Sequence, residues 1–295
     1  MQKPFLVGAG WLTLACLISV INDSIVKSVS SNLPTINIVF LKFLFSFLSL
    51  MPFLKADTFQ KVLTHKKIHF LRGASFAIAM LPWCYGLIQL PLPLMTCLNF
   101  STPLFVTLLA AFFLKERFTL PKIAATVLGF LGIVVSVGAS FSQMSVAVFW
   151  ALCATFLFAS LDIANKKLLN LQENRLVMMI APTFWSAAFL LPFALYTWYT
   201  PSIQDIAVLA VLGVGGNLLF FCFLKAFSCY QVSALQPFKY TEFLFSCAAS
   251  LIFFQDKPTW NLMMGTFLII AATFYLSWSE LKKVSKTTNP VSQPA

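Results

Sequence analysis

The sequence contains few charged residues. Asp, Glu, Lys and Arg make up 10% of its 295 positions, whereas a soluble globular domain has about 25%. Hydrophobic residues make up 59%, and 33 residues are Phe. Because so little polar surface cannot cover a water-soluble globule, the composition excludes a soluble enzyme, a disordered chain and a disulfide scaffold. It predicts a polytopic membrane protein.

Histidine is also scarce, and both residues, His65 and His69, lie in one basic loop. This excludes a histidine-based metal site or catalytic base inside the membrane. The seven Cys form no Cys-x-x-Cys motif and lie within or at the ends of apolar stretches, as is typical of buried thiols. The glycines of Gly213-Val-Gly-Gly216 and the pair Gly129/Gly132 are interpreted as helix-packing sites. We therefore expect no catalytic residues, no metal, no cofactor and no enzymatic activity.

Several long apolar stretches can each cross a membrane, whose hydrocarbon core of about 30 Å needs roughly 20 helical residues. The ten stretches are about 5–27, 36–54, 70–89, 93–114, 122–139, 145–167, 175–198, 204–227, 232–254 and 260–279. The connections between them are short, and only 55–69 is long enough to hold structure outside the membrane. The expected fold is therefore all-α, with ten transmembrane helices.

Basic residues are distributed unequally over the connections. The net charge of +11 comes mostly from Lys and Arg at one set of span ends, whereas the opposite connections contain one basic residue, Lys257. Since cytoplasmic loops carry the excess of Lys and Arg, both termini are predicted to be cytoplasmic. The charge is thus a topology signal. Nucleic acid is not an expected partner, because a basic patch needs a continuous solvated face to act on phosphate.

The chain repeats itself at an offset of about 140 residues. The repeated residues, first half and then second, are Asp23 and Asp162, Lys27 and Lys166, Pro52 and Pro192, and Glu116 and Asp256. The constant offset predicts two homologous five-helix repeats, 1–141 and 142–280, and a disordered cytoplasmic tail, 281–295. Because five is odd, the second repeat is inverted, and inverted repeats suit a protein that opens alternately to the two sides around a central site. The alternative is chance similarity between apolar helices.

Ionisable side chains interrupt the apolar stretches at six positions: Asp23, Lys42, Asp162, Lys225, Lys239 and Glu242. A charge at the bilayer centre costs at least about 2.5–3.5 kcal/mol on insertion scales, so it usually faces a wet cavity or a partner. These residues are therefore candidates for substrate binding. Structural alternatives exist for three of them. Lys225 can snorkel to the cytoplasmic face, and Asp23 and Asp162 can form ion pairs with the lysines four residues later.

Lys239 and Glu242 fall near mid-membrane in the ninth stretch and share a helix face. Gln236-Pro237 precedes them, and Asn99-Phe-Ser-Thr-Pro103 lies at the corresponding place in the first half. Interrupted helices at matching places in two inverted halves indicate a substrate site, so we predict the site here and include Asn99. The alternative is that Lys239 and Glu242 only neutralise each other and fix helix packing.

Three aromatic side chains are predicted to line the same cavity: Trp83, Tyr85 and Tyr240. Ring faces bind a cation with about 0.5–2 kcal/mol each and can stack on a flat base. Most other rings fit lipid-facing positions or the aromatic belt at the membrane interface.

Several motifs resemble a known family of carriers. The ten spans in two halves, with Leu114-Lys-Glu-Arg-Phe118 at the end of the fourth span, resemble the EamA-type branch of the drug/metabolite transporter superfamily over about residues 5–280. Four longer motifs look like those of the S-adenosylmethionine uptake transporters of obligate intracellular bacteria. They are Asn22-Asp23 with Lys27, Leu161-Asp-Ile-Ala-Asn-Lys-Lys167, Leu224-Lys-Ala-Phe-Ser228 and Pro237-Phe-Lys-Tyr-x-Glu242.

The resemblance implies an inner-membrane secondary carrier that lies in a lipid bilayer and imports S-adenosylmethionine, in exchange for S-adenosylhomocysteine, by alternating access. Lys239 and Lys42 would bind the substrate carboxylate, Glu242 a cationic group, and Trp or Tyr side chains the sulfonium and the adenine. Superfamily membership alone fixes no substrate. The alternatives are an amino-acid or other small-metabolite exporter of the same superfamily and a non-transporting structural membrane subunit.

Overall fold

The computed structural model describes residues 2–29, 33–54, 62, 66–113, 120–138, 141–170, 175–229 and 238–288, and over these ranges every regular element is a helix. The first half contains α1 (Gln2–Val29), α2 (Thr35–Leu50) with the 3-10 turn η1 (Met51–Phe53), α4 (Lys66–Gln89), α5 (Leu92–Asn99), α6 (Thr102–Phe113) and α7 (Leu120–Val137). The second half contains α8 (Phe141–Asn170), α9 (Arg175–Tyr196), α10 (Ile203–Cys229), α12 (Thr241–Phe254) and α13 (Trp260–Thr288).

These helices correspond to the ten predicted spans, with α5 and α6 sharing the fourth span. Within the described ranges, five helices are long and apolar enough to cross a membrane, and five shorter apolar helices complete the set. Their outward faces carry large apolar side chains such as Leu71, Ile252 and Phe267, each more than two-thirds exposed. Lipid can cover such faces because each helix satisfies its own backbone hydrogen bonds. The predicted all-α, polytopic class is confirmed.

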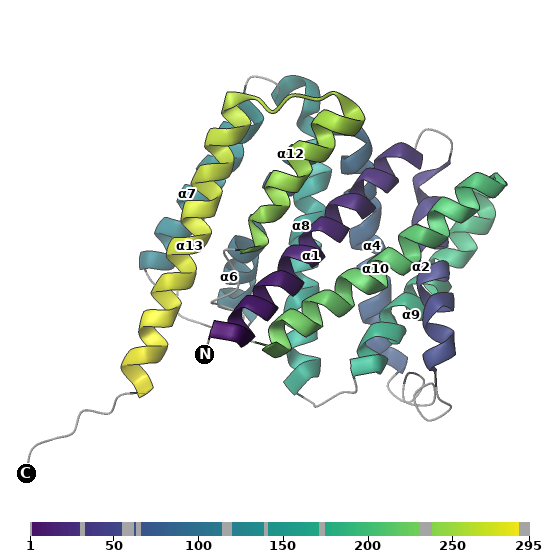
Figure 1. Ribbon diagram of the computed structural model, residues 1–295, viewed down its shortest axis with the longest axis horizontal. Helices are drawn as coiled ribbons and strands as arrows, with labels where there is room; N and C mark the ends of the chain where they lie inside the picture. Colours follow the sequence, from purple (N-terminus) through teal and green to yellow (C-terminus); the bar gives the residue numbers. More distant parts are fainter. Residues whose placement is uncertain are drawn as a thin grey trace, which may run out of the picture.

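The two halves interlock. α1 packs along α10 and α4 along α8, while α2 lies against α9 and α7 against α13. The sequence repeat matches α1 to α8 and α4 to α10, so the α1–α10 and α4–α8 contacts are equivalent. The α2–α9 and α7–α13 contacts each join matching spans. Figure 1 shows α7 and α13 at one side of the bundle and α2, α9 and α10 at the other. This is the contact pattern of two halves related by a two-fold axis.

Successive spans run in alternating directions between two edges of the bundle. In Figure 1 the N-terminal end of α1 and the C-terminal end of α13 lie at the same edge. This edge, called here the basic edge, also carries the first residues of α4 and α9, Lys66 and Arg175. The opposite edge carries the α4–α5 turn and the loop 255–259. α13 continues through residues 281–288, which the sequence assigned to the tail, and residues 289–295 lie outside the described ranges.

Two spans are interrupted near the centre of the bundle. The fourth span breaks between α5 and α6, and α12 begins only at Thr241. The predicted interruption at Gln236-Pro237 lies outside the described residues. Phe100 and Tyr240, at matching places in the two halves, bring their rings together edge to face with 5.2 Å between centroids. The two interruptions therefore meet, and α5 packs directly against α12.

Glycines allow the helices of the two halves to approach closely. A Cβ on Gly213 would lie 2.6 Å from a backbone nitrogen of α2, and one on Gly265 would lie 2.5 Å from the carbonyl oxygen of Gly132. A side chain at either position would force helices apart. The packing interpretation of Gly213 and Gly132 is thus confirmed. Gly216 differs, because a Cβ at this position would lie 4.0 Å from the Lys42 side chain and would not force helices apart.

Candidate functional site

A cavity of about 370 Å³ lies between the two halves. Its lining comes from α1, α2, α4, α8, α9 and α10 and from both interrupted spans. Asn99 and Thr102 line the cavity from the fourth span. Lys239 and Glu242 line it from the ninth. From these positions the cavity extends toward the basic edge, where it is lined by Arg72 near the start of α4. The cavity therefore lies at the place where the inverted repeat predicts a site.

Most of the predicted site residues line this cavity. The six are Asp23, Lys42, Trp83, Asn99, Lys239 and Glu242. They come from separate helices of both halves, so only the folded bundle brings them together. Two carboxylates and two ammonium groups thus share one cavity with an indole ring and an amide.

Two other predicted residues point elsewhere. Tyr85 is 38% exposed and does not line the cavity. It follows Trp83 by two residues, which turns it about 200° around the helix, so the two side chains cannot face the same space. Lys225 is also exposed, and its Nζ lies 5.6 Å from the centre of the Phe221 ring. Neither belongs to the cavity, and the exposure of Lys225 agrees with the snorkelling alternative.

The last two predicted residues are Tyr240 and Asp162. Tyr240 is partly buried beside the cavity, but its ring packs on Phe100 and its hydroxyl shares a hydrogen bond with that of Thr273. Its position is therefore that of a spacer between the interrupted spans. The side chain of Asp162 lies outside the described residues.

Glu242 is buried and is held from another helix. Its carboxylate accepts a 2.7 Å hydrogen bond from the Ser19 hydroxyl of α1. It lies in the first turn of α12, where the helix dipole favours a negative charge. In the part of the chain that the structure describes, Glu242 and Lys239 form no ion pair. The two side chains are thus not in direct contact as an ion pair, and the alternative that they only neutralise each other stays a prediction.

Asp23 occupies the next turn of α1 after Ser19 and lines the same cavity. Its carboxylate accepts a 3.3 Å hydrogen bond from the indole Nε1 of Trp83, which is itself buried. The alternative of a local ion pair between Asp23 and Lys27 is wrong, because Lys27 extends to the opposite edge and pairs with Asp256. The Asp23 charge is therefore directed toward the cavity.

Lys42 enters the cavity from α2 and lies near enough to Asp23 for electrostatic attraction. Its Nζ is 3.7 Å from the sulfur of Met80. Because a thioether is a weak acceptor, the ammonium retains donors for an anionic ligand. Gly216 faces the Lys42 side chain and leaves space beside it.

An aromatic wall of four side chains, Phe43, Phe76, Phe158 and Trp83, forms one side of the cavity. Adjacent rings meet edge to face, with centroid separations of 5.0 Å, 6.2 Å and 5.8 Å along this series. The wall ends at Trp83, whose indole holds Asp23. A flat ring and a neighbouring cation could therefore bind side by side here.

Sequence reasoning missed several cavity residues, including Ser19, Arg72, Asn217 and Phe158. Arg72 is buried and donates a 3.1 Å hydrogen bond to the Met178 carbonyl. Its position inside the predicted stretch 70–89 was the available signal. The others gave none, because Ser, Asn and Phe are common in apolar helices.

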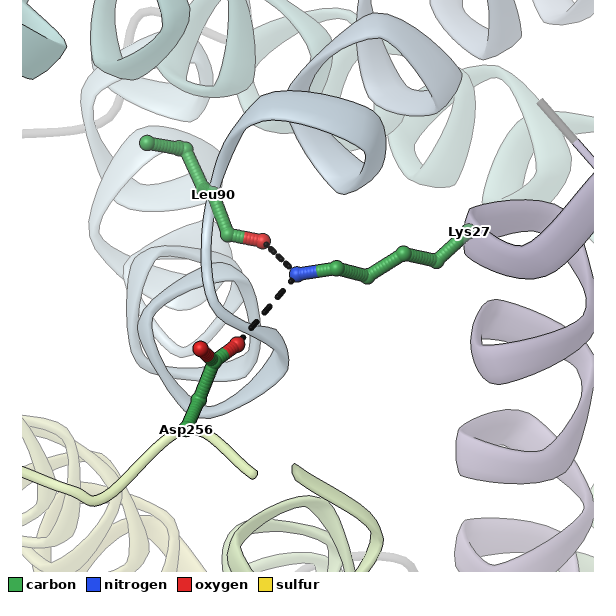
Figure 2. A network of polar contacts seen from close by, with 3 residues as sticks. All are labelled: Lys27, Leu90 and Asp256. Carbon is green, nitrogen blue, oxygen red and sulfur yellow. Dashed lines mark hydrogen bonds and ion pairs between the residues drawn. The ribbon is translucent and has the colours of Figure 1, made fainter. Parts of the chain in front are cut away.

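A cluster around Lys27 joins the two halves at the opposite edge. Lys27 Nζ donates a 2.9 Å hydrogen bond to the Leu90 carbonyl and lies 3.6 Å from Asp256 Oδ2 (Figure 2). It also lies 4.9 Å from the centre of the Phe254 ring. These contacts join the end of α1 to the α4–α5 turn and to the α12–α13 loop. One side chain thus links both halves at this edge.

The arrangement suits the binding of a charged organic molecule. Among the described residues, no cluster of His, Cys, Asp and Glu could hold a metal ion. The cavity instead offers anionic, cationic and aromatic groups to one ligand.

Comparisons with known proteins agree on the class of molecule. The EamA-like transporter family matches the chain twice, over residues 6–138 and 145–278. The S-adenosylmethionine uptake transporters of Rickettsia conorii and Rickettsia prowazekii are each 34% identical to it, over 96% of this chain and 97% and 96% of theirs. The riboflavin transporter of Vibrio cholerae is 24% identical, over 96% of this chain and 97% of its own. One solved crystal structure has the same fold, with a TM-score of 0.59 at 15% identity, covering 95% of this chain and 98% of that one.

The separation of Lys239 from Glu242 predicts how their variants fold. Lys239→Ala and Glu242→Gln should each accumulate in the membrane at close to the wild-type level, because neither change strands an ion-paired partner. Quantitative immunoblots of membrane fractions measure this, with Lys67→Gln as a control at an exposed charged side chain. If each single variant were depleted from the membrane and the double variant Lys239→Met with Glu242→Gln accumulated normally, the two charges would be a structural pair.

Proposed function

Since the chain belongs to the EamA-like transporter family, we propose that it imports S-adenosylmethionine across a bacterial inner membrane, in exchange for S-adenosylhomocysteine. The single observation that carries the proposal is the cavity that combines acidic, basic and aromatic side chains at the two interrupted spans. Relatives that are named for S-adenosylmethionine uptake and are 34% identical over nearly the whole chain support this substrate. The family consists of transporters, so an enzymatic reaction is not part of the proposal.

The chemical groups of the cavity match those of the proposed substrate. S-adenosylmethionine carries a carboxylate, an ammonium, a sulfonium and a flat adenine. In the proposed complex, Lys42 and Lys239 attract the carboxylate and Glu242 binds the ammonium, as charge-assisted hydrogen bonds are the strongest available. The aromatic wall offers faces on which the adenine can stack. Asn99 supplies an amide beside these groups.

Two other substrate classes fit less of the cavity. A free amino acid would use one acidic and one basic group but would leave the aromatic wall without a partner. Riboflavin, which the Vibrio cholerae relative is named for, would stack on the wall but has no ammonium for Glu242. A carrier for either substrate would not need both the charged groups and the aromatic wall, whereas S-adenosylmethionine uses both.

The proposed mechanism is alternating access around this cavity. The cavity extends toward the basic edge, and in this proposal the Lys27 cluster closes the opposite edge. With the basic edge toward the cytoplasm, as the distribution of Lys and Arg favours, both termini are cytoplasmic and the cavity faces inward. Outward opening then requires Lys27 to leave Asp256 and Leu90, and the two-fold related halves provide the rocking motion.

The substrate proposal predicts a specific pattern of competition. In cells or vesicles that contain the carrier, uptake of labelled S-adenosylmethionine should exceed that of empty controls. S-adenosylhomocysteine should compete more strongly than methionine, adenosine or riboflavin, because each of these three has only part of the binding surface. A loss of about 1.4 kcal/mol already lowers affinity tenfold.

Glu242→Gln is the matched negative control for this assay, since it keeps the size of the side chain and removes its charge. It should abolish uptake while the protein still accumulates. Equal competition by free methionine would instead assign the chain to amino-acid transport, and dominant competition by riboflavin would assign it to flavin transport.

The Lys27 cluster predicts a change in access from outside. Consider a chain in which the native cysteines are replaced and a single cysteine is placed at Asn99 in the cavity. A membrane-impermeant thiol reagent added outside should label it slowly, and Lys27→Gln should raise the rate about tenfold or more. This factor follows from the loss of a hydrogen bond to a charged group, worth about 1.5–3 kcal/mol, while the partly exposed ion pair with Asp256 adds less.

Lys257→Gln, at the residue after Asp256 in the α12–α13 loop, serves as the control and should leave the rate unchanged. Equal labelling rates in the wild type and Lys27→Gln would contradict a closing role for this cluster.

A further inference from the structure

The two carboxylates of the cavity lie about one helical turn apart. Glu242 is fixed at the level of Ser19 by its hydrogen bond, and Asp23 lies four residues further along α1, a rise of about 6 Å. Both carboxylates line the same cavity. Because like charges repel strongly in a low-dielectric cavity, a ligand with two positive centres at a similar spacing is favoured over one with a single centre.

The substrate proposed above has two such centres. In S-adenosylmethionine, four bonds separate the ammonium nitrogen from the sulfonium sulfur, which places them about 5 Å apart in an extended chain. S-adenosylhomocysteine keeps the ammonium, but its sulfur is an uncharged thioether. Only one of the two exchanged molecules therefore presents a cation to each carboxylate.

The surroundings of the two carboxylates suit different cations. An ammonium has three N–H donors. A sulfonium has none, so charge and ring faces must attract it. Asp23 is held by the Trp83 indole N–H, and the Trp83 ring packs on Phe158 with 5.8 Å between centroids. This corner combines a fixed negative charge with aromatic surface, whereas Glu242 is held by the Ser19 hydroxyl.

We propose that Asp23, positioned by the indole N–H of Trp83, binds the sulfonium and determines the preference for S-adenosylmethionine over S-adenosylhomocysteine. The inference rests on the proposed function and adds to it a basis for discrimination. Asp23 contacts the substrate, and Trp83 is a positioning residue that acts through it. Removal of the methyl group from the substrate abolishes this contact, so the demethylated product binds less tightly and is released more readily.

The test compares two labelled substrates in proteoliposomes that contain the full chain. Uptake of S-adenosylmethionine and of S-adenosylhomocysteine is measured separately for the wild type and Asp23→Asn. The Asn side chain can still accept the indole hydrogen bond, so the substitution removes charge and keeps shape. The KM for S-adenosylmethionine should rise about tenfold or more, as expected for the loss of an interaction with a charged group. The KM for S-adenosylhomocysteine should change less than about twofold.

Two further variants make the comparison specific. Glu242→Gln should abolish the uptake of both substrates alike, because both carry the ammonium. Trp83→Phe keeps a ring but removes the N–H that holds Asp23. It should therefore lower the preference for S-adenosylmethionine over S-adenosylhomocysteine, by a smaller factor than Asp23→Asn does. This variant also decides the question if Asp23→Asn accumulates poorly.

The outcomes separate the inference from the proposed function. One outcome is that the wild type takes up S-adenosylmethionine while Asp23→Asn raises the KM for both substrates by the same factor or leaves both unchanged. In that case Asp23 does not bind the sulfonium, and only this inference fails. Absence of S-adenosylmethionine uptake by the wild type would instead overturn the proposed function itself.

Discussion

The cost of placing a charge in hydrocarbon is the constraint on which this structure depends. Asp23, Lys42 and Glu242 all belong to membrane spans, where an isolated charge would cost at least about 2.5–3.5 kcal/mol. All three line one cavity between the two halves rather than the outer surface. The interruptions of the fourth and ninth spans meet at Phe100 and Tyr240, beside this space. The inverted repeat thus places both breaks and the charges at the same centre.

Helix α1 connects the centre of the cavity with its closed edge. It carries Ser19 and Asp23 toward the cavity and, one turn later, Lys27 toward Leu90 and Asp256. A ligand that binds Asp23 therefore contacts the same helix that carries Lys27 at the opposite edge. In the proposed carrier this shared helix provides a physical route by which substrate binding biases the closure, because a rigid element with two arrangements can be shifted from either site.

Much of the fold could be predicted from the sequence because the bilayer fixes the length of each span, so hydropathy alone locates the helices. The constant offset of the repeat gave the inversion, and the contacts between α1 and α10 and between α4 and α8 have the matching symmetry. Charges in apolar stretches also stand out, which is why Asp23, Lys42 and Glu242 were recognised as candidates for one site.

The remaining features depend on tertiary contacts that local patterns do not contain. The partner of Lys27 is Asp256, far along the chain, although a carboxylate lies only four residues before it. Tyr85 was misplaced because its direction follows from its distance to Trp83 along the helix, not from its residue type. Ser19 and Phe158 belong to classes so frequent in apolar helices that only the folded structure reveals their place in the cavity.

The central claim is that the charged cavity between the halves is the substrate site. An experimental structure of the purified carrier determined with saturating S-adenosylmethionine tests it most directly. The account predicts ligand density inside the cavity, with the methionyl end between Glu242 and Asp23 and the adenine on the aromatic wall. Ligand density at any other place in a carrier shown to transport this substrate would contradict it.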